Sequence, residues 1–251
     1  MKLHIFNPEH DIALAANQER FTAPHAGRRL RTDLGFIPAF WASEGDMVLV
    51  DDVEAAIEAR RHLSKFGKDV VFVTYADLKA FAFEDVESFR VDPWGWDRTI
   101  KEQLLRANSN LQPFMPSDDT LAAIREMSSR RFAAEHLLPL LREAGEEKTV
   151  GEARYCTTME EVKQAMAQNG KSVLKSPWSS SGRGVRYVET AAPDAHLEGW
   201  VANVVKRQGG IMVEPLYNKV YDFGLEFFSN ADGTIDFKGI SLFATRGGAY
   251  I

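Results

Sequence analysis

A stretch of small residues at 175–185 has the composition of an anion-binding loop. It reads Lys-Ser-Pro-Trp-Ser-Ser-Ser-Gly-Arg-Gly-Val and lies between two short predicted strands. Glycine and serine let backbone N–H groups approach an anion closely, while the serine hydroxyls and Lys175 add further donors. No Gly-Lys-Ser/Thr triplet closes the loop, and a strand rather than a helix follows, so it is not a Walker P-loop. The loop predicts a polyphosphate site of another kind; the alternative is an ordinary hairpin tip with a solvated lysine.

The loop resembles the glycine-rich loop of ATP-grasp proteins, in which a strand lysine precedes a Ser/Gly loop that covers the triphosphate. Three further segments resemble that family in the same order. Residues 129–145 resemble its opening helix, 149–157 the segment that leads into the loop, and 210–217 the inter-lobe strand that binds adenine. The resemblance covers residues 117–228 and implies that ATP and Mg²⁺ are cofactors.

The resemblance also implies roles around the triphosphate. Lys175 would hold the α- and β-phosphates, and Arg131 would be the second cation, with Arg130 as an alternative. Ser180, Ser181 and Gly182 would donate to the outer oxygens. Arg183 would be the catalytic residue, because phosphoryl transfer is accelerated mainly by positioning and charge stabilisation.

Adenine and ribose have their own requirements. Adenine needs one acceptor and one donor from an extended strand, which the Pro215 carbonyl and the Tyr217 N–H would supply. Asp222 would accept from the ribose hydroxyls, with Glu226 as a second candidate on the same strand face. The implied nucleotide-binding set is Arg131, Lys175, Ser180, Ser181, Gly182, Gly184, Glu214, Pro215, Tyr217 and Asp222.

The implied reaction is that of a carboxylate–amine ligase. ATP would phosphorylate a carboxylate to an acyl phosphate, and an amine would then displace phosphate. In the family, Mg²⁺ is held by a Glu or Asp and a Glu-x-Asn pair on strands after the hinge. The sequence up to Ile251 contains no such pair. We therefore expect the ATP-grasp domain to be incomplete, and no metal ligand is assigned.

Two other functions fit the same features. A kinase of this fold, acting on a small polyol or sugar phosphate, would use the basic residues Arg28, Arg29 and Arg31. A nucleotide-binding protein without catalysis would bind ATP and not turn it over. The three readings differ in whether turnover needs a carboxylate with an amine, an alcohol alone, or does not occur.

A second polar cluster, residues 7–11, follows the first predicted strand. It reads Asn-Pro-Glu-His-Asp. Loops after the strands of an α/β sheet commonly bind ligands, so His10 and Asp11, with His25, are candidates for acceptor-substrate binding or general-base catalysis. The alternative is that Asp11 caps a helix and His10 is structural.

These residues need elements that position them. Strands are predicted at 3–6, 46–50 and 69–75, with a helix over 53–63 between the last two. Strand 69–75 is almost wholly apolar, which predicts that both of its faces are covered. This alternation indicates a doubly wound α/β lobe at residues 1–115, in which Phe89, Trp94 and Trp96 pack.

Residues 116–251 are expected to form an α+β ATP-grasp domain. Asp118 or Asp119 would cap a helix over 120–127, and apolar positions from Phe132 to Leu141 predict a second helix. Thr158 and Glu161 form a capping box, and strands 172–175 and 185–188 flank the glycine-rich loop.

Composition bounds the remaining possibilities. The chain has 251 residues, 45% of them hydrophobic, which is ample for a packed core. The net charge of −6 argues against nucleic-acid binding, and one cysteine, Cys156, indicates a reducing compartment. No segment has the length of a membrane span or the pattern of a signal peptide. We expect a cytoplasmic protein whose partners are small-molecule carboxylates and amines.

Overall fold

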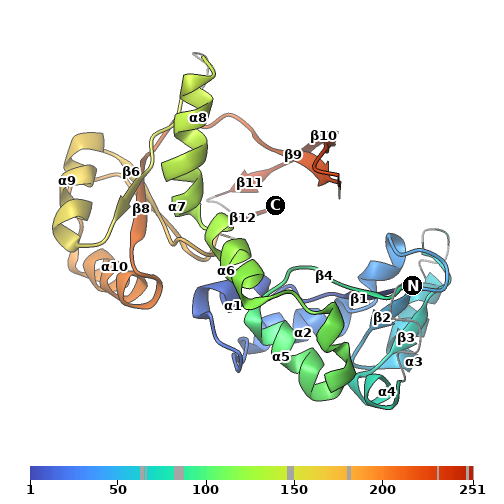
Figure 1. The fold of residues 1–251 in the computed structure, drawn as a ribbon. Coiled ribbons are helices and arrows are strands. Elements are labelled where there is room, and N and C mark those ends of the chain that lie inside the picture. Colours follow the sequence, from blue (N-terminus) through green and yellow to red (C-terminus); the bar gives the residue numbers. More distant parts are fainter. Residues whose placement is uncertain are drawn as a thin grey trace. The chain divides into compact units, whose positions relative to one another are not determined.

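The chain forms two compact units, residues 1–129 and 130–251, which are described separately (Figure 1). The computed structural model describes residues 1–62, 65, 67–81, 88–145, 150–179, 182–230, 232–246 and 249–250. The predicted domain boundary at residue 115 stays a prediction. By its packing, the helix Asp118–Met127 belongs to the first unit. No described helix combines the length and apolar composition that a bilayer crossing requires.

The first unit is built on a parallel sheet, as the alternation of strands and helices predicted. Its strands are β1 (Lys2–Ile5), β2 (Met47–Leu49), β3 (Val71–Val73) and β4 (Arg90–Pro93), in the order β3-β2-β1-β4. The prediction that residues 69–75 are covered on both faces is wrong. Strand β3 lies at the sheet edge and pairs only with β2, which leaves Val71 53% exposed.

Helices cover both faces of this sheet. Side chains alternate along each strand, so Leu3, Ile5 and Leu49 pack in one core cluster while Val48 packs in another. Phe89 is buried as predicted, but Trp94 is 61% exposed, because β4 ends at Pro93 and the chain turns outward. The helices are α1 (His10–Ala16), α2 (His25–Leu34), α3 (Val53–His62), α4 (Tyr75–Ala80), α5 (Arg98–Ala107) and α6 (Asp118–Met127), with 3-10 turns at Ile37–Phe40 and Ser109–Phe114.

Helix caps follow from local hydrogen bonding and correct two expectations. The cap of α6 is Ser117, whose hydroxyl accepts from the N–H of Thr120, rather than Asp118 or Asp119. Asp11 lies inside the first turn of α1 and does not cap it. The predicted capping box of Thr158 and Glu161 is confirmed.

The second unit contains an antiparallel sheet, one face of which packs against two helices (Figure 1). Its strands are β5 (Arg154–Cys156), β6 (Ser172–Lys175), β7 (Val185–Val188) and β8 (Ile211–Pro215), in the order β5-β8-β6-β7. Helices α9 (Met159–Asn169) and α10 (Ala195–Gln208) bury Leu174 and Val213. Cys156 is fully buried in the same cluster, and burial raises the pKa of its thiol to about 11.

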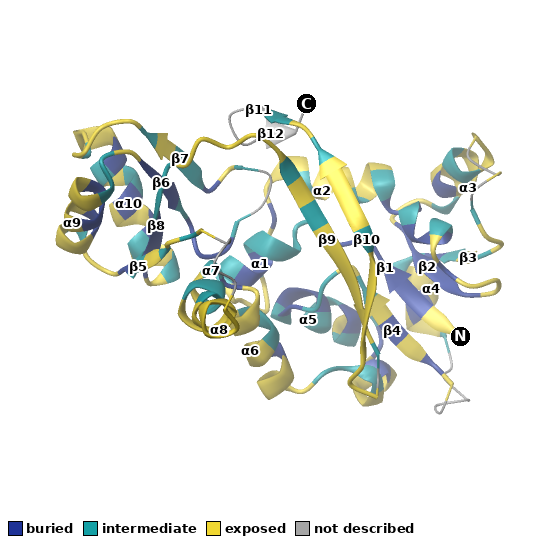
Figure 2. Ribbon diagram, turned by 90° about the horizontal axis from the view of Figure 1, so that it is seen from above, coloured by how far each residue is buried: buried dark blue, intermediate teal, exposed yellow. Residues whose placement is uncertain are grey.

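The remaining helices and strands of this unit come before or after that sheet along the chain. Residues 130–143 form α7 (Arg130–Phe132), a π-helical stretch (Ala133–Leu137) and α8 (Leu138–Glu143), so the predicted helix is interrupted by wider turns. After β8, strands β9 (Asp222–Ser229) and β10 (Ile235–Phe243) pair as an antiparallel hairpin, and β11 (Thr245–Arg246) pairs with β12 (Ala249–Tyr250). Figure 2 shows buried residues gathered in β6 and β8, whereas β9 and β10 are mainly exposed.

A buried histidine links three strands of the first sheet. The Nε2 atom of His4 lies 3.2 Å from Asp46, and its Nδ1 atom lies 3.1 Å from Asp92. Burial opposes protonation of this ring, but the two carboxylates outweigh it and raise the pKa of His4 above 6.5. His4 therefore folds into a site that favours its cationic form.

Stability should depend on pH through this group. Because the folded-state pKa is raised, the His4 contribution is complete below about pH 6.5 and is lost as pH rises through the folded value. We expect His4→Asn to lower the unfolding free energy by roughly 1–3 kcal/mol at mildly acidic pH, since it removes the charged partner of the buried Asp46 carboxylate.

Urea unfolding at about pH 5.5 and about pH 8.5 checks this expectation. The destabilisation by His4→Asn should shrink at the higher pH, whereas the exposed control His196→Asn should change neither midpoint. A penalty for His4→Asn that grows with pH would contradict the assignment.

Candidate functional site

The best-defined polar group of the second unit is an ion pair across β6 and β8. The Nζ atom of Lys175 lies 2.5 Å from a carboxylate oxygen of Glu214, and both side chains are partly accessible. Their neighbours Leu174 and Val213 are buried against α9 and α10. Because side chains alternate along a strand, Lys175 and Glu214 lie on the opposite face. The predicted strand lysine is therefore on the face opposite α9 and α10, together with the buried side chain of Met212.

A second cation lies over the same face. Tyr155, Met212 and Lys175 are direct cross-strand neighbours, which places them in one row. The guanidinium of Arg131 lies 4.7 Å from the centre of the Tyr155 ring, and its Nε donates to Glu135 at 2.8 Å. Two strand spacings, roughly 10 Å, separate Tyr155 from Lys175. Arg131 and Lys175 therefore lie toward the two ends of one row of side chains.

Arg130 holds the start of the glycine-rich loop. Its guanidinium donates to the carbonyl of Ser176 at 2.6 Å, and to the hydroxyl and carbonyl of Ser179 at 2.9 and 3.0 Å. The N–H of Arg130 also donates to the carbonyl of Pro177 at 3.1 Å. One arginine thus fixes residues 176–179, a role that the sequence analysis did not assign to it.

Gly182 and Gly184 allow the two sides of the loop to approach each other closely. Gly182 has a φ of 72°, a region that side chains disfavour. A Cβ on Gly184 would lie 2.4 Å from the Cβ and Oγ of Ser179, so the two sides of the loop meet there. Arg183 is exposed at the tip, and Ser180 and Ser181 lie outside the described residues.

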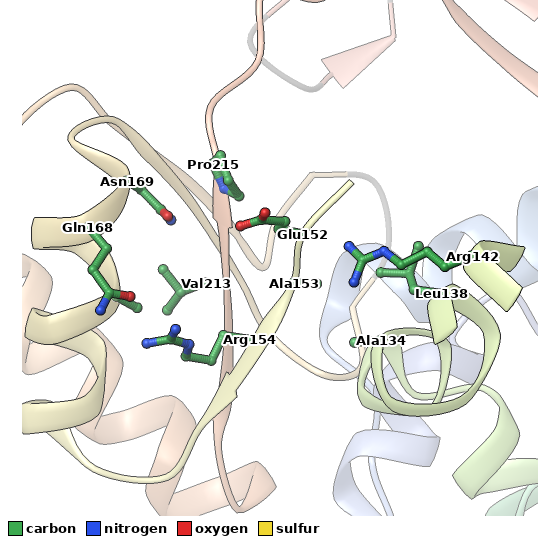
Figure 3. A pocket seen from close by; sticks show the side chains of 11 residues that line it. Ala134, Leu138, Arg142, Glu152, Ala153, Arg154, Gln168, Asn169, Val213 and Pro215 are labelled. Carbon is green, nitrogen blue, oxygen red and sulfur yellow. The ribbon is translucent and has the colours of Figure 1, made fainter. Parts of the chain in front are cut away.

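The predicted adenine strand is in place, but the pocket beside it lies on the other side of the sheet. That pocket, of about 330 Å³, is lined by Val213 and Pro215, by Gln168 and Asn169 of α9, and by Arg142 of α8 (Figure 3). Pro215 and Val213 share one side of β8, opposite Lys175 and Glu214. Beyond β8, the Leu216 N–H donates to the backbone carbonyl of Lys171, and Tyr217 is about half exposed.

The predicted ribose carboxylate is already engaged. Asp222 pairs with Lys219 at 2.7 Å and accepts from the hydroxyl of Thr245. These hydrogen bonds hold the pKa of Asp222 below its ordinary value. Glu226 accepts from Ser241 at 2.8 Å. Asp222 stays ionised and oriented, as a hydroxyl acceptor must be.

The polar cluster of the first unit is more tightly built than its sequence suggested. The Asn7 side chain donates to the Gly95 carbonyl at 2.8 Å and accepts from its N–H at 3.2 Å. The Nδ1 atom of His10 lies 3.1 Å from Asp97, whose other oxygen caps α5 through the Ile100 N–H. These residues follow β1 and β4, which are adjacent in the sheet. Within the described ranges, neither Asp11 nor His25 makes a hydrogen bond or ion pair with this dyad.

A second ion pair joins Arg31 to Glu9, the residue that precedes His10 of the His10–Asp97 pair. An Arg31 nitrogen donates to Glu9 at 2.7 Å, while Glu9 Oε2 and Arg31 Nε are buried without a partner among the described residues. Burial raises the pKa of Glu9. Burial also raises the pKa of Tyr75 to about 12, and the charges of Arg31 and Glu9 act on the same hydroxyl. The sequence analysis missed Glu9, Gly95 and Asp97; the Gly-Trp-Asp run after β4 was the available signal.

Both units together have the fold of ATP-grasp enzymes, with a parallel N-terminal lobe followed by an antiparallel sheet with helices. The chain is similar to an N5-carboxyaminoimidazole synthetase from Staphylococcus aureus in complex with ADP. The TM-score is 0.50 and the identity 13%, over 99% of this chain and 56% of that chain. It is also similar to a biotin carboxylase from Campylobacter jejuni in a β,γ-ATP complex, with a TM-score of 0.51 and 15% identity, over 99% of this chain and 52% of that chain.

The chain thus spans little more than half the length of these solved structures. No family model and no curated protein matches the sequence. The predicted fold class is confirmed, whereas the individual site residues stay predictions.

The contact at Gly184 can be tested by adding one methyl group. We expect Gly184→Ala to force Ser179 away and to loosen its bonds to Arg130, which should cost roughly 1–3 kcal/mol of unfolding free energy. Gly199→Ala is the control: a Cβ there meets nothing within 4 Å, and inside α10 the alanine should stabilise by roughly 0.5–1 kcal/mol. Urea unfolding measures both variants, and a midpoint for Gly184→Ala at or above that of the wild-type protein would show that the loop is not closed at Gly184.

Proposed function

We propose that this chain is the nucleotide-binding part of an ATP-dependent ligase that joins a carboxylate to an amine through an acyl phosphate. The observation that carries the proposal is the partly accessible pair of Lys175 with Glu214 on the sheet face opposite α9 and α10, next to a loop closed at Gly184. The fold shared with a synthetase and a carboxylase supports it. We further propose that the protein is cytoplasmic and acts on small molecules.

The chain's own residues would divide the work on ATP. Glu214 orients the Lys175 ammonium, which keeps two further N–H donors for the α- and β-phosphates. Gly182 and Gly184 would bring backbone N–H groups toward the outer phosphates, and Ser180 and Ser181 would donate to the outer oxygens. Arg183, exposed at the tip, would stabilise charge on the transferred phosphoryl group, and Arg131 would be the second cation.

The nucleoside would bind along the strand beyond Glu214. The Pro215 carbonyl and the Tyr217 N–H would bind adenine, and Asp222 would accept from the ribose while Lys219 holds its carboxylate in place. Bound ATP supplies the phosphoryl group that activates the carboxylate. Within the described ranges, no three His, Cys, Asp or Glu side chains come together to hold a metal, so no step is assigned to Mg²⁺.

The acceptor substrate would bind at His10 and Asp11 of the first unit. The kinase alternative needs basic residues open to an anionic substrate, but Arg31 pairs with Glu9 and Arg29 with Asp33, while Arg28 donates to a backbone carbonyl. These contacts favour the ligase over a sugar-phosphate kinase.

Lys175→Met should weaken ATP binding by about 10- to 100-fold, because the loss of a charged hydrogen bond to phosphate removes roughly 1.5–3 kcal/mol. Calorimetric titration of ATP measures the change. Lys171→Met is the control, since Lys171 precedes the same strand but pairs with Glu189 at the surface. An unchanged dissociation constant for Lys175→Met would remove the assignment of the loop.

A further inference from the structure

The first part of the glycine-rich loop, residues 176–178, is buried, and we call it the loop base. Buried backbone groups need partners inside the protein, because they have lost their hydrogen bonds to water. The Ser176 N–H donates to the Gly184 carbonyl at 2.8 Å. The Ser176 carbonyl accepts from the Arg130 guanidinium at 2.6 Å, and the Pro177 carbonyl accepts from the Arg130 N–H at 3.1 Å. Since Pro177 has no N–H, every backbone polar group of these two residues is engaged.

Gln208 completes the loop base at its third residue. Its side-chain oxygen accepts from the Trp178 N–H at 3.0 Å, and its side-chain nitrogen donates to the Trp178 carbonyl at 3.2 Å. A primary amide suits this task, because it carries an acceptor and a donor side by side. All five backbone polar groups of the loop base are therefore occupied within the protein. No N–H of these three described residues remains for an anion.

The end of α10 fixes the position of Gln208. Gln208 is the last residue of this helix, and Gly209 ends it with a left-handed φ of 85° and an N–H that donates to the Val205 carbonyl at 2.8 Å. A Cβ on Gly210 would lie 2.3 Å from the ring of Tyr155, so the turn after the helix packs against a side chain of β5. The Gln208 side chain therefore extends from a fixed backbone.

The occupied loop base limits where phosphate can bind. Ser179 is only partly buried and Arg183 is exposed, in contrast to the three residues of the base. Any backbone N–H that the loop donates to phosphate must therefore come from a residue after Trp178, beside the Lys175 ammonium. A base that is ordered before nucleotide arrives also lowers the entropic cost of binding, because only the rest of the loop must then be ordered.

We propose that Gln208 is a positioning residue of the nucleotide site, which holds the loop base so that only the loop beyond Trp178 donates backbone N–H groups to phosphate. This inference rests on the proposed function. Both polar atoms of the Gln208 amide are used by Trp178, so Gln208 acts on the nucleotide only through the loop. Arg130 shares the task from the start of α7.

Hydrogen exchange tests the loop base without any ligand. In NMR of the nucleotide-free protein, the amides of Ser176 and Trp178 should exchange slowly, and ATP should slow them no further. Gln208→Met keeps the length of the side chain but neither amide group, so the Trp178 amide should exchange about 10-fold faster. Fast exchange of the Trp178 amide in the wild-type protein, strong new protection by ATP, or an unchanged rate in Gln208→Met would overturn the proposal.

A comparison of ATP with adenosine separates positioning from general stability. We expect Gln208→Met to weaken ATP binding by about 5- to 20-fold, the effect of losing one or two hydrogen bonds that order the loop. Adenosine has no phosphates, so its dissociation constant should be unchanged. Calorimetry measures ATP binding, and NMR titration measures adenosine binding. Gln164→Met, at an exposed glutamine of α9, is the matched control and should behave as the wild-type protein with both ligands.

The outcomes distinguish this inference from the proposed function. If the wild-type protein binds neither ATP nor adenosine, the proposed function fails, and the exchange rates still decide whether Gln208 holds the loop base. If Gln208→Met binds ATP as tightly as the wild-type protein, the nucleotide site stands and the positioning role is overturned. Equal weakening of ATP and adenosine binding would also overturn that role, because the substitution would then act on the fold as a whole.

Discussion

The strict alternation of side chains along β6 and β8 is the constraint on which the nucleotide site depends. Leu174 and Val213 are anchored against α9 and α10, and this anchoring leaves no freedom in where Lys175 and Glu214 project. A slip of one residue would bury an ammonium and a carboxylate and expose leucine and valine. The hydrophobic core therefore sets the register of the polar pair, and the pair needs no further support from the loop.

Each unit fixes its polar groups by a similar use of backbone hydrogen bonds. In the second unit Arg130 gathers the carbonyls of residues 176–179, and in the first Asn7 pairs with both backbone groups of Gly95. A side chain that satisfies backbone groups of a distant loop removes conformers which the chain would otherwise sample. Both candidate sites are thus ordered before any ligand binds.

Local sequence patterns predicted many helices and strands, but they did not predict which distant residues are neighbours in space. Periodicity and caps predicted β1, β2 and β3 of the first sheet but not β4, and they predicted the strands around the loop and the capping box at Thr158, because those signals lie within a few residues. Asp97 could not be placed beside His10, since their proximity follows from β1 and β4 being adjacent. The composition of residues 69–75 likewise gave a strand but not its position at the sheet edge, where Val71 is exposed.

The burial of Cys156 makes this chain a ready scaffold for site-specific probes. Its thiol is fully buried with a raised pKa, so it presents little thiolate to alkylating reagents. It is also the one cysteine in the sequence. A pair of cysteines introduced on α3 and α10 would therefore take spectroscopic labels with little background. The signal of each label would report whether its own unit responds when nucleotide is added.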